Sequence, residues 1–266
     1  MTAIIESRPR IPRLAMVFIA AVVVMLLTAP KAGAWSETAG DFKIEKPYSS
    51  HGSTEVTVKE YTSNDTNITL PSTVTYRGTE YKVTAVGSNV LKKLAGAEGI
   101  DLTVTIPEGY TSIESEAFKN CYGLKTITIP SSVTVINASA FEGCKDLATV
   151  TFTEGTEALT FRNKVFLGCT ALNHLQLPAR VTSVGAGSFQ GCTSLTDLTV
   201  ADGCAAYVAQ DGTLFEKNDD GNGYTLHTYA PASTATSYTV PDTVNSLPVT
   251  SIFRMAFQNN ATLQSV

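Results

Sequence analysis

The sequence repeats itself every 23 to 25 residues, and this interval limits the folds that the chain can adopt. Phenylalanine recurs at Phe118, Phe141, Phe166 and Phe189, with spacings of 23, 25 and 23 residues. A cysteine stands three residues after each of them, and a leucine three residues after each cysteine. One unit of this length cannot bury its own apolar face, so such units stack on one another. We therefore expect a solenoid.

The recurring side chains are the expected core of this stack. A diverged last copy contains Ala256-Phe257 and Ile252, with Asn260 where the other copies have cysteine. We assign the following residues to the repeat core: Phe118, Cys121, Leu124, Phe141, Cys144, Leu147, Phe166, Cys169, Leu172, Phe189, Cys192, Leu195, Phe257 and Leu263.

Each unit also contains a short strand. The pattern L-x-x-L-x-L, as at Leu124, Ile127 and Ile129, alternates apolar with polar residues and indicates a strand with one buried face. A proline follows at Pro107 and Pro130, and it ends the strand because it has no N–H to donate. Stacked units would align these strands in a parallel sheet along one side of the solenoid.

These positions resemble the BspA-like leucine-rich repeat family. Its unit is similar to L-x-x-L-x-L-P-x-x-[LV]-x-x-I-x-x-x-A-F-x-x-C, and residues 65–266 carry the resemblance, with 124–144 the best copy. The resemblance implies a β-rich solenoid of leucine-rich repeat coils with a parallel sheet on one face. It also implies an N-terminal antiparallel β cap and an inserted β-hairpin, since the segments 41–83 and 207–240 are similar to such parts of family members.

The chain divides into five segments on this basis. We assign residues 1–34 to a signal peptide, 35–95 to the β cap with a degenerate first repeat, and 96–203 to the leucine-rich repeats. Residues 204–239 are the hairpin insertion, in which Thr213–Lys217 pairs with 225–229, and 240–266 are a last, incomplete repeat. Because the repeat breaks off inside a strand, we expect either more chain or a partner over that edge.

The first 34 residues have the order of a secretory signal. Arg8, Arg10 and Arg13 precede an uncharged apolar run, and Ala32-Gly33-Ala34 supplies the small residues of a cleavage site after Ala34. The alternative is an uncleaved membrane anchor. Either interpretation exports the rest of the chain, so we expect a secreted or cell-surface protein with no membrane span after signal removal.

Charge narrows the classes of partner. The chain has 19 basic and 24 acidic residues, and 15 basic and 23 acidic residues remain without 1–34, a net charge of −8. A nucleic-acid binder needs a basic surface over the phosphates, so we expect no nucleic-acid partner. Neutral or cationic ligands suit the chain better.

The five cysteines do not have the spacing of a metal site. Four occupy one repeat position, where neighbouring coils lie ~4.8 Å apart with parallel side chains. A disulfide requires the two Cβ atoms to approach to ~3.8 Å. We therefore expect reduced, buried cysteines that pack as small apolar residues. Cys204 lies outside this register, and the repeat pattern does not assign it.

No motif in the sequence indicates catalysis, a cofactor or a metal. His51, His174 and His227 have no second ligand or triad partner at a suitable spacing, and we expect all three at the surface. The oxygen-rich run 218–223 lacks the calcium-loop pattern and is expected to form the hairpin turn. We expect a non-enzymatic protein without a cofactor.

The outward positions of the strands are the candidate ligand-binding face. Threonine dominates them, either because it favours strands or because its hydroxyl contacts a ligand. The candidate residues are Thr103, Thr105, Thr126, Thr128, Thr149, Thr151, His174, Gln176, Asp197 and Thr199.

Three functions remain open at this point. The family resemblance implies adhesion, by attachment to an extracellular protein such as a host matrix or cell-surface protein. The solenoid could instead be a structural spacer in a longer surface protein. The third possibility, a glycan- or ice-surface binder, uses the Thr-x-Thr rows, although His174, Gln176 and Asp197 interrupt them.

Overall fold

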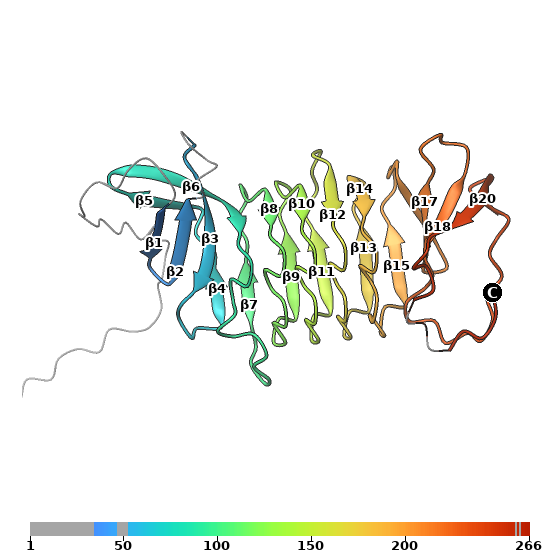
Figure 1. The fold of residues 1–266 in the computed structure, drawn as a ribbon, viewed down its shortest axis with the longest axis horizontal. Helices are drawn as coiled ribbons and strands as arrows, with labels where there is room; N and C mark the ends of the chain where they lie inside the picture. Colours follow the sequence, from blue (N-terminus) through green and yellow to red (C-terminus); the bar gives the residue numbers. More distant parts are fainter. Residues whose placement is uncertain (1–34, 47–52, 259, 261) are drawn as a thin grey trace, which may run out of the picture.

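A computed structural model describes residues 35–46, 53–258, 260 and 262–266. The expected signal peptide, its cleavage site at Ala34, and His51 lie outside the described residues. The described chain forms an elongated stack of coils with a β cap at one end and a second small β unit at the other (Figure 1). None of the described residues form a helix that is long and apolar enough to cross a membrane.

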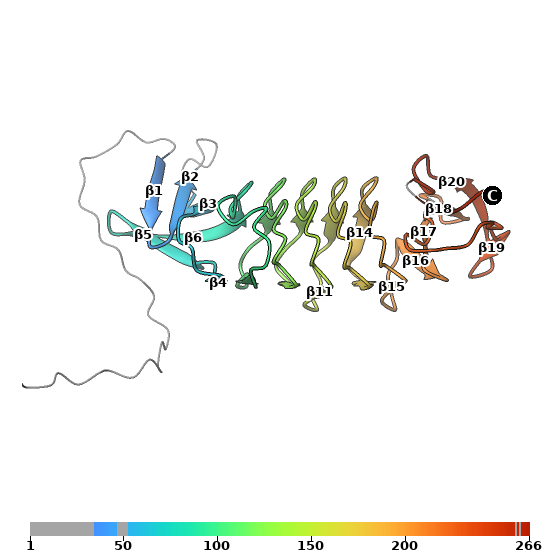
Figure 2. The same ribbon diagram turned by 90° about the horizontal axis from the view of Figure 1, so that it is seen from below.

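Each coil of the solenoid contributes one strand to each of two parallel sheets (Figure 2). The first, which we call the threonine sheet, has the order β15-β13-β11-β9. Its strands are β9 (Thr126–Ile129), β11 (Thr149–Phe152), β13 (His174–Leu177) and β15 (Asp197–Val200). The second sheet contains β8 (Ser112–Ile113), β10 (Val135–Ile136), β12 (Leu159–Phe161) and β14 (Val181–Val184).

The predicted solenoid of leucine-rich repeat coils with a parallel sheet on one face is confirmed, and the coils form a second sheet that the sequence analysis did not predict. The strands of the second sheet are two to four residues long, and their sequences, such as Val135-Ile136, are too short to show alternation. These strands form because they pair with the neighbouring coil. No local sequence pattern therefore predicts them.

The N-terminal cap extends both sheets. Its strands are β1 (Trp35–Ala39), β2 (Phe42–Lys46), β3 (Glu55–Tyr61), β4 (Asn67–Thr69), β5 (Thr73–Tyr76), β6 (Thr79–Val86) and β7 (Thr103–Thr105). β1, β2 and β3 pair antiparallel, while β3 and β6 pair parallel, and β6 joins the second sheet through β8. The parallel β4–β7 pair continues the line of the threonine sheet, with a bridge from Leu102 to Leu124.

The C-terminal unit has the order β16-β17-β18-β20-β19. Its strands are β16 (Tyr207–Gln210), β17 (Thr213–Lys217), β18 (Tyr224–Thr228), β19 (Thr243–Val244) and β20 (Leu247–Ile252). The expected pairing of β17 with β18 is present, and the positive φ of Asp211 and Gly212 forms the turn that adds β16 to it. The insertion is therefore three-stranded, and it interrupts the second sheet after β14.

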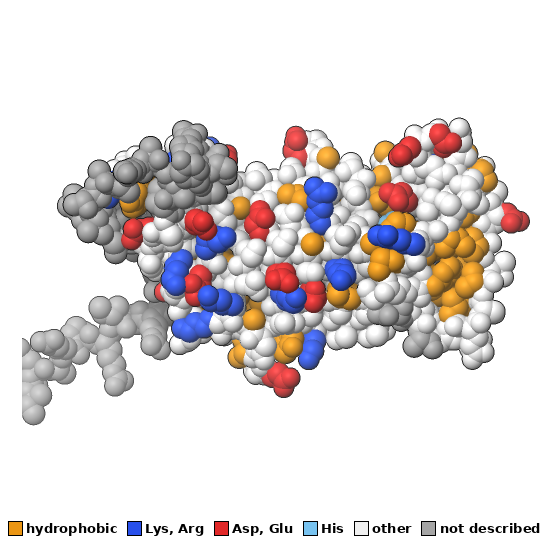
Figure 3. Space-filling model, viewed as in Figure 1, with side chains coloured by type: hydrophobic (Ala, Val, Ile, Leu, Met, Phe, Trp, Pro, Cys, Tyr) orange, Lys and Arg blue, Asp and Glu red, His pale blue; other side chains and the backbone are white. Residues whose placement is uncertain are grey.

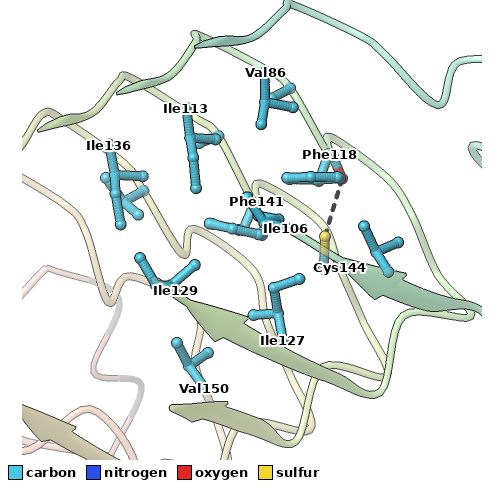
Figure 4. Close-up of a cluster of buried hydrophobic side chains, with 14 of the residues drawn as sticks. Val86, Ile106, Ile113, Phe118, Ile127, Ile129, Ile136, Phe141, Cys144 and Val150 are labelled. Carbon is cyan, nitrogen blue, oxygen red and sulfur yellow. Dashed lines mark hydrogen bonds between the residues drawn. The ribbon is translucent and has the colours of Figure 1, made fainter. Parts of the chain in front are cut away.

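The repeated phenylalanines form a column through the core. Phe118, Phe141, Phe166 and Phe189 are at most 1% exposed, and consecutive rings stack at centroid distances of 5.2, 5.4 and 6.3 Å. Figure 4 shows Phe118 and Phe141 between the inward isoleucines of the two sheets. Burial of such rings supplies the apolar free energy of folding that one coil alone cannot obtain.

The repeated cysteines are free thiols in the same core. The Sγ of Cys144 lies 3.0 Å from the carbonyl oxygen of Phe118 in the preceding coil and donates to it (Figure 4). Cys169 and Cys192 make the equivalent bond at 3.2 Å. Each of these three thiols therefore fills apolar space and also links its coil to the preceding one.

Main-chain hydrogen bonds in the turns join the coils as well. In the turn around Phe118, the N–H groups of Glu116, Phe118 and Asn120 donate to the carbonyls of residues 138, 140 and 142 in the next coil, at 2.8–3.0 Å. The turns around Phe141 and Phe166 repeat this three-bond ladder onto the coils that follow them.

The last repeat is less buried than the others. Phe257 and Leu263 are only half-buried, and Ile252 is 48% exposed. Beyond β18, apolar side chains gather at the C-terminal end of the surface (Figure 3).

Replacing Phe141 with Ala is expected to lower the free energy of unfolding by about 3–5 kcal/mol, because a cavity remains between two stacked rings. Urea denaturation followed by circular dichroism measures the loss. Phe257→Ala serves as the matched control and should cost clearly less, because its ring is half-buried. Equal losses would contradict the assignment of the column.

The thiols of the repeat should be unreactive in the folded protein. Burial raises the pKa of Cys121 and of Cys192 to about 12, and raises the pKa of Cys144 and Cys169 well above the ordinary value. We expect a thiol reagent at pH 8 to modify only the partly exposed Cys204 until denaturant is added. Mass spectrometry of the alkylated peptides measures this, and rapid alkylation of Cys144 in the folded protein would contradict it.

Candidate ligand-binding face

The outward side chains of the threonine sheet form two straight rows. Hydrogen-bonded register pairs Thr126 with Thr149, Thr149 with His174, and His174 with Asp197. In the second row Thr128 pairs with Thr151, and Gln176 with Thr199. Strand alternation produces this arrangement, because Ile127 and Val150 turn inward between the threonines. Eight of the ten predicted face residues lie in these rows, while Thr103 and Thr105 lie on β7, which the Leu102–Leu124 bridge joins to this sheet. All ten but the half-buried Thr199 are exposed.

The cap adds two residues that the sequence analysis missed. β4 lies beside β7 with Asn67 opposite Thr103 and Thr69 opposite Thr105, so each row gains one exposed polar residue. The signal for them was the alternation Asn67-Ile68-Thr69, which matches Thr103-Val104-Thr105. We call the two rows, with these additions, the threonine face.

The hydroxyls of the threonine face have no partners among the described residues. This is true of Thr126, Thr128, Thr149 and Thr151 in the centre of the face. Threonines elsewhere in the solenoid differ: the hydroxyl of Thr111 donates to the carbonyl of Thr84, and that of Thr134 to the carbonyl of Thr111, both at 3.2 Å. The central hydroxyls therefore remain available as both donors and acceptors for a ligand.

Charge on the threonine face is confined to one end. His174 Nδ1 lies 2.5 Å from Asp197 Oδ2, and both side chains are 55% exposed. Within the described residues, no group of three or more His, Cys, Asp or Glu side chains could hold a metal ion. The face therefore offers hydrogen bonds and methyl contacts over its length and one polar pair at its β13–β15 end.

The insertion closes the edge of the second sheet with side chains. Among the described residues no strand of the next coil follows β14, and three residues of the insertion occupy hydrogen-bonding groups of this strand instead. Val184 N–H donates to Tyr207 Oη at 2.8 Å, and the Val184 carbonyl accepts from His227 Nε2 at 2.8 Å. Cys204 Sγ lies 3.6 Å from the carbonyl oxygen of Val181 and donates to it. This contact gives a structural role to the cysteine that the repeat pattern left unexplained.

The expected surface position of His227 was wrong. Its side chain is 3% exposed and stacks on Phe253 at a centroid distance of 5.0 Å. Desolvation lowers the pKa of His227, although Glu216 and the bond to Val184 oppose this shift. The neutral ring donates from Nε2 to Val184, and its Nδ1 accepts from Thr228 Oγ1 at 2.9 Å. Tertiary packing of the insertion, which the sequence pattern does not reveal, buries this residue.

Stability should fall as the pH drops below about 6.5, the pKa of an unfolded histidine. The pKa of folded His227 is lower than that, so the unfolded chain binds more protons in this range and protonation favours unfolding. Among the described residues, Glu216 is the charged group that acts on the His227 ring. The carboxylate of Glu216 accepts a hydrogen bond from Tyr207 Oη at 2.8 Å. Urea midpoints at pH 7.5 and 5.0 measure the effect.

His227→Gln is the matched variant, because its amide can still donate to Val184 but does not titrate. We expect a smaller difference between the two urea midpoints in this variant than in the parent protein. An equal difference would show that His227 does not cause the pH dependence.

Comparison with known proteins places the repeats in a family. Residues 101–209 match the family model described as the BspA type leucine rich repeat region, in six copies. The search of curated proteins gave no match to this sequence. Among solved structures, the chain is similar to the pneumococcal vaccine antigen PcpA, with a TM-score of 0.60 and 20% identity over 88% of this chain and 64% of that one. The chain thus spans less than two thirds of the length of PcpA.

Two further structures are similar at lower TM-scores. A leucine rich cell surface protein from Faecalibacterium prausnitzii A2-165 has a TM-score of 0.45 and 25% identity over 90% of this chain and 76% of that one. The leucine-rich repeat protein of T. pallidum has a TM-score of 0.49 and 21% identity, over 66% and 78%. The similarity to PcpA supports the fold, and the family model supports the repeat. The repeat region of this chain, residues 101–209, therefore belongs to the BspA-type leucine-rich repeat family.

Proposed function

We propose that this protein is an exported, non-enzymatic binding protein that attaches to an extracellular protein through its threonine face. The observation that carries the proposal is the two rows of exposed side chains in register, whose central hydroxyls have no partner among the described residues. Repeat solenoids commonly bind along such extended surfaces. The membership of the repeats in the BspA-type leucine-rich repeat family supports the same conclusion.

The chemistry of the face favours a neutral protein surface as the ligand. Each central threonine presents a methyl group beside its hydroxyl, so a ligand gains apolar contact and hydrogen bonds together. Many such contacts, each weak, would add up over the strands from β4 to β15. His174 and Asp197 would set the orientation of the ligand at one end, because they are the polar pair of the rows.

Replacing Thr126, Thr128, Thr149 and Thr151 with Lys is expected to abolish binding to a protein ligand. The substitutions put four positive charges and long side chains over the centre of the face. Biolayer interferometry of the purified protein against immobilised extracellular-matrix proteins and glycans measures the affinities. We expect saturable binding to a matrix protein and a loss of at least about tenfold in the variant, which corresponds to about 1.4 kcal/mol.

The matched control carries the same four charges outside the threonine face, at Thr156, Ser183, Ser194 and Thr234, which are exposed and whose hydroxyls have no partner among the described residues. It should bind as the parent protein does. Equal losses in both variants would indicate a nonspecific effect of charge and contradict the proposal. Absence of binding to every protein would favour the spacer function, and binding to glycans alone would replace the protein ligand with a carbohydrate.

A further inference from the structure

The chain contains a single Asn-Gly dipeptide, Asn222-Gly223, and it lies in the turn that joins β17 to β18. This hairpin belongs to the C-terminal end of the molecule (Figure 1). Asn222 is exposed, and its side-chain amide has no partner among the described residues. Because glycine has no side chain, nothing shields the main-chain nitrogen of Gly223 from the amide carbon of Asn222.

The Gly223 nitrogen is the one that the hydrogen bonds of the turn leave out. The N–H of Asn218 donates to the carbonyl of Gly223 at 2.9 Å, and the N–H of Gly221 donates to the carbonyl of Asn218 at 2.8 Å. The N–H of Asn222 donates to Asp220 Oδ1 at 2.9 Å. Among the described residues, the N–H of Gly223 has no acceptor. Its proton can therefore pass to solvent without the loss of a bond within the protein.

Two neighbouring positions of the same turn lack this combination. The side chain of Asn218 is held at both ends, because Nδ2 donates to Thr250 Oγ1 at 2.8 Å and Oδ1 accepts from Thr225 Oγ1 at 3.0 Å. Asp220 is also followed by a glycine, but the N–H of Gly221 is already donated to a carbonyl. The turn therefore favours reaction at Asn222 over reaction at either neighbour.

We propose that Asn222 is a site of spontaneous deamidation. The Gly223 nitrogen loses its proton and bonds to Cγ of Asn222, while the Cγ–Nδ2 bond breaks and the amide leaves as ammonia with that proton. The resulting succinimide takes up one water. Opening at the former side-chain carbonyl gives aspartate, and opening at the main-chain carbonyl gives isoaspartate, whose chain runs through the former side chain. Both products add one carboxylate to the hairpin.

Isoaspartate would strain a turn that has no spare room. Its main chain is longer by one methylene immediately before Gly223. A Cβ on Gly223 would lie 2.8 Å from the carbonyl oxygen of Pro248 and 3.0 Å from Thr250 Cγ2, so this residue cannot shift toward β20. Asn218 ties the other side of the turn to β20 through Thr250. The longer chain therefore breaks the bond between the Asn218 N–H and the Gly223 carbonyl, where β18 begins.

Incubation of the purified full chain at pH 8, followed by trypsin digestion and mass spectrometry, tests the site. Cleavage at Lys217 and Arg254 releases one peptide that contains three asparagines, Asn218, Asn222 and Asn245. We expect loss of the Asn222 form and growth of its isoaspartate and aspartate forms, while the other two asparagines remain. The loss should be slower at pH 6, because less base is present to remove the N–H proton.

Asn222→Gln is the matched variant, because the longer side chain does not form the same ring and an exposed position tolerates it. Its peptide should stay unchanged under the same incubation. Hydrogen exchange then measures the effect on the turn. The Asn218 amide should exchange faster in the aged parent protein than in the fresh one, and at equal rates in aged and fresh Asn222→Gln.

Two results would overturn the proposal. One is an intact Asn222 in the folded protein after a synthetic peptide of residues 218–224 has been converted in the same buffer, which would show that the fold protects the site. The other is equal conversion of Asn245, which would show that unfolded chain, and not this turn, reacts. Neither result bears on the threonine face, whose test uses different residues.

Discussion

The contact of each coil with the next is the interaction on which the rest of the structure depends. A coil of about 23 residues cannot enclose a core, so its phenylalanine, its thiol and the N–H groups of its turn all find their partners in a neighbouring coil. The two parallel sheets follow from the same stacking, because strands at equal positions in successive coils lie side by side. The straight rows of the threonine face are then a geometric consequence of a strand pattern that repeats in register.

The stacking shapes the surface differently where it is regular and where it breaks. The regular part places like residues next to each other and produces an extended neutral face. The insertion breaks the stack after β14, and its side chains close only the edge of the second sheet, through Tyr207 and His227. A small recess lies between the turn around Phe189 and the C-terminal unit, beside this break.

Sequence reasoning succeeded where a residue acts through a repeated position. The inward phenylalanines and the outward threonines follow from strand alternation and from the spacing of the copies, and the β17–β18 hairpin follows from its turn residues. Sequence reasoning failed where a residue contacts a segment that is distant along the chain and is not repeated. The burial of His227, the edge bond of Cys204 and the short second sheet each depend on a segment far along the chain that no local pattern identifies.

Arg180 is a further residue whose environment only the tertiary structure reveals. Its sequence position follows Pro178 in a turn, where a solvated charge is the ordinary expectation. In the structure it is 7% exposed, and its Nη1 donates to the carbonyls of Val133 and Glu157, which come from the two preceding coils. The sequence alone determined the period, the core positions and the outward rows, because these depend on chemistry that recurs every coil. Only the tertiary structure decided which edges are closed and which donors remain open, because those depend on where a single insertion comes to lie against the stack.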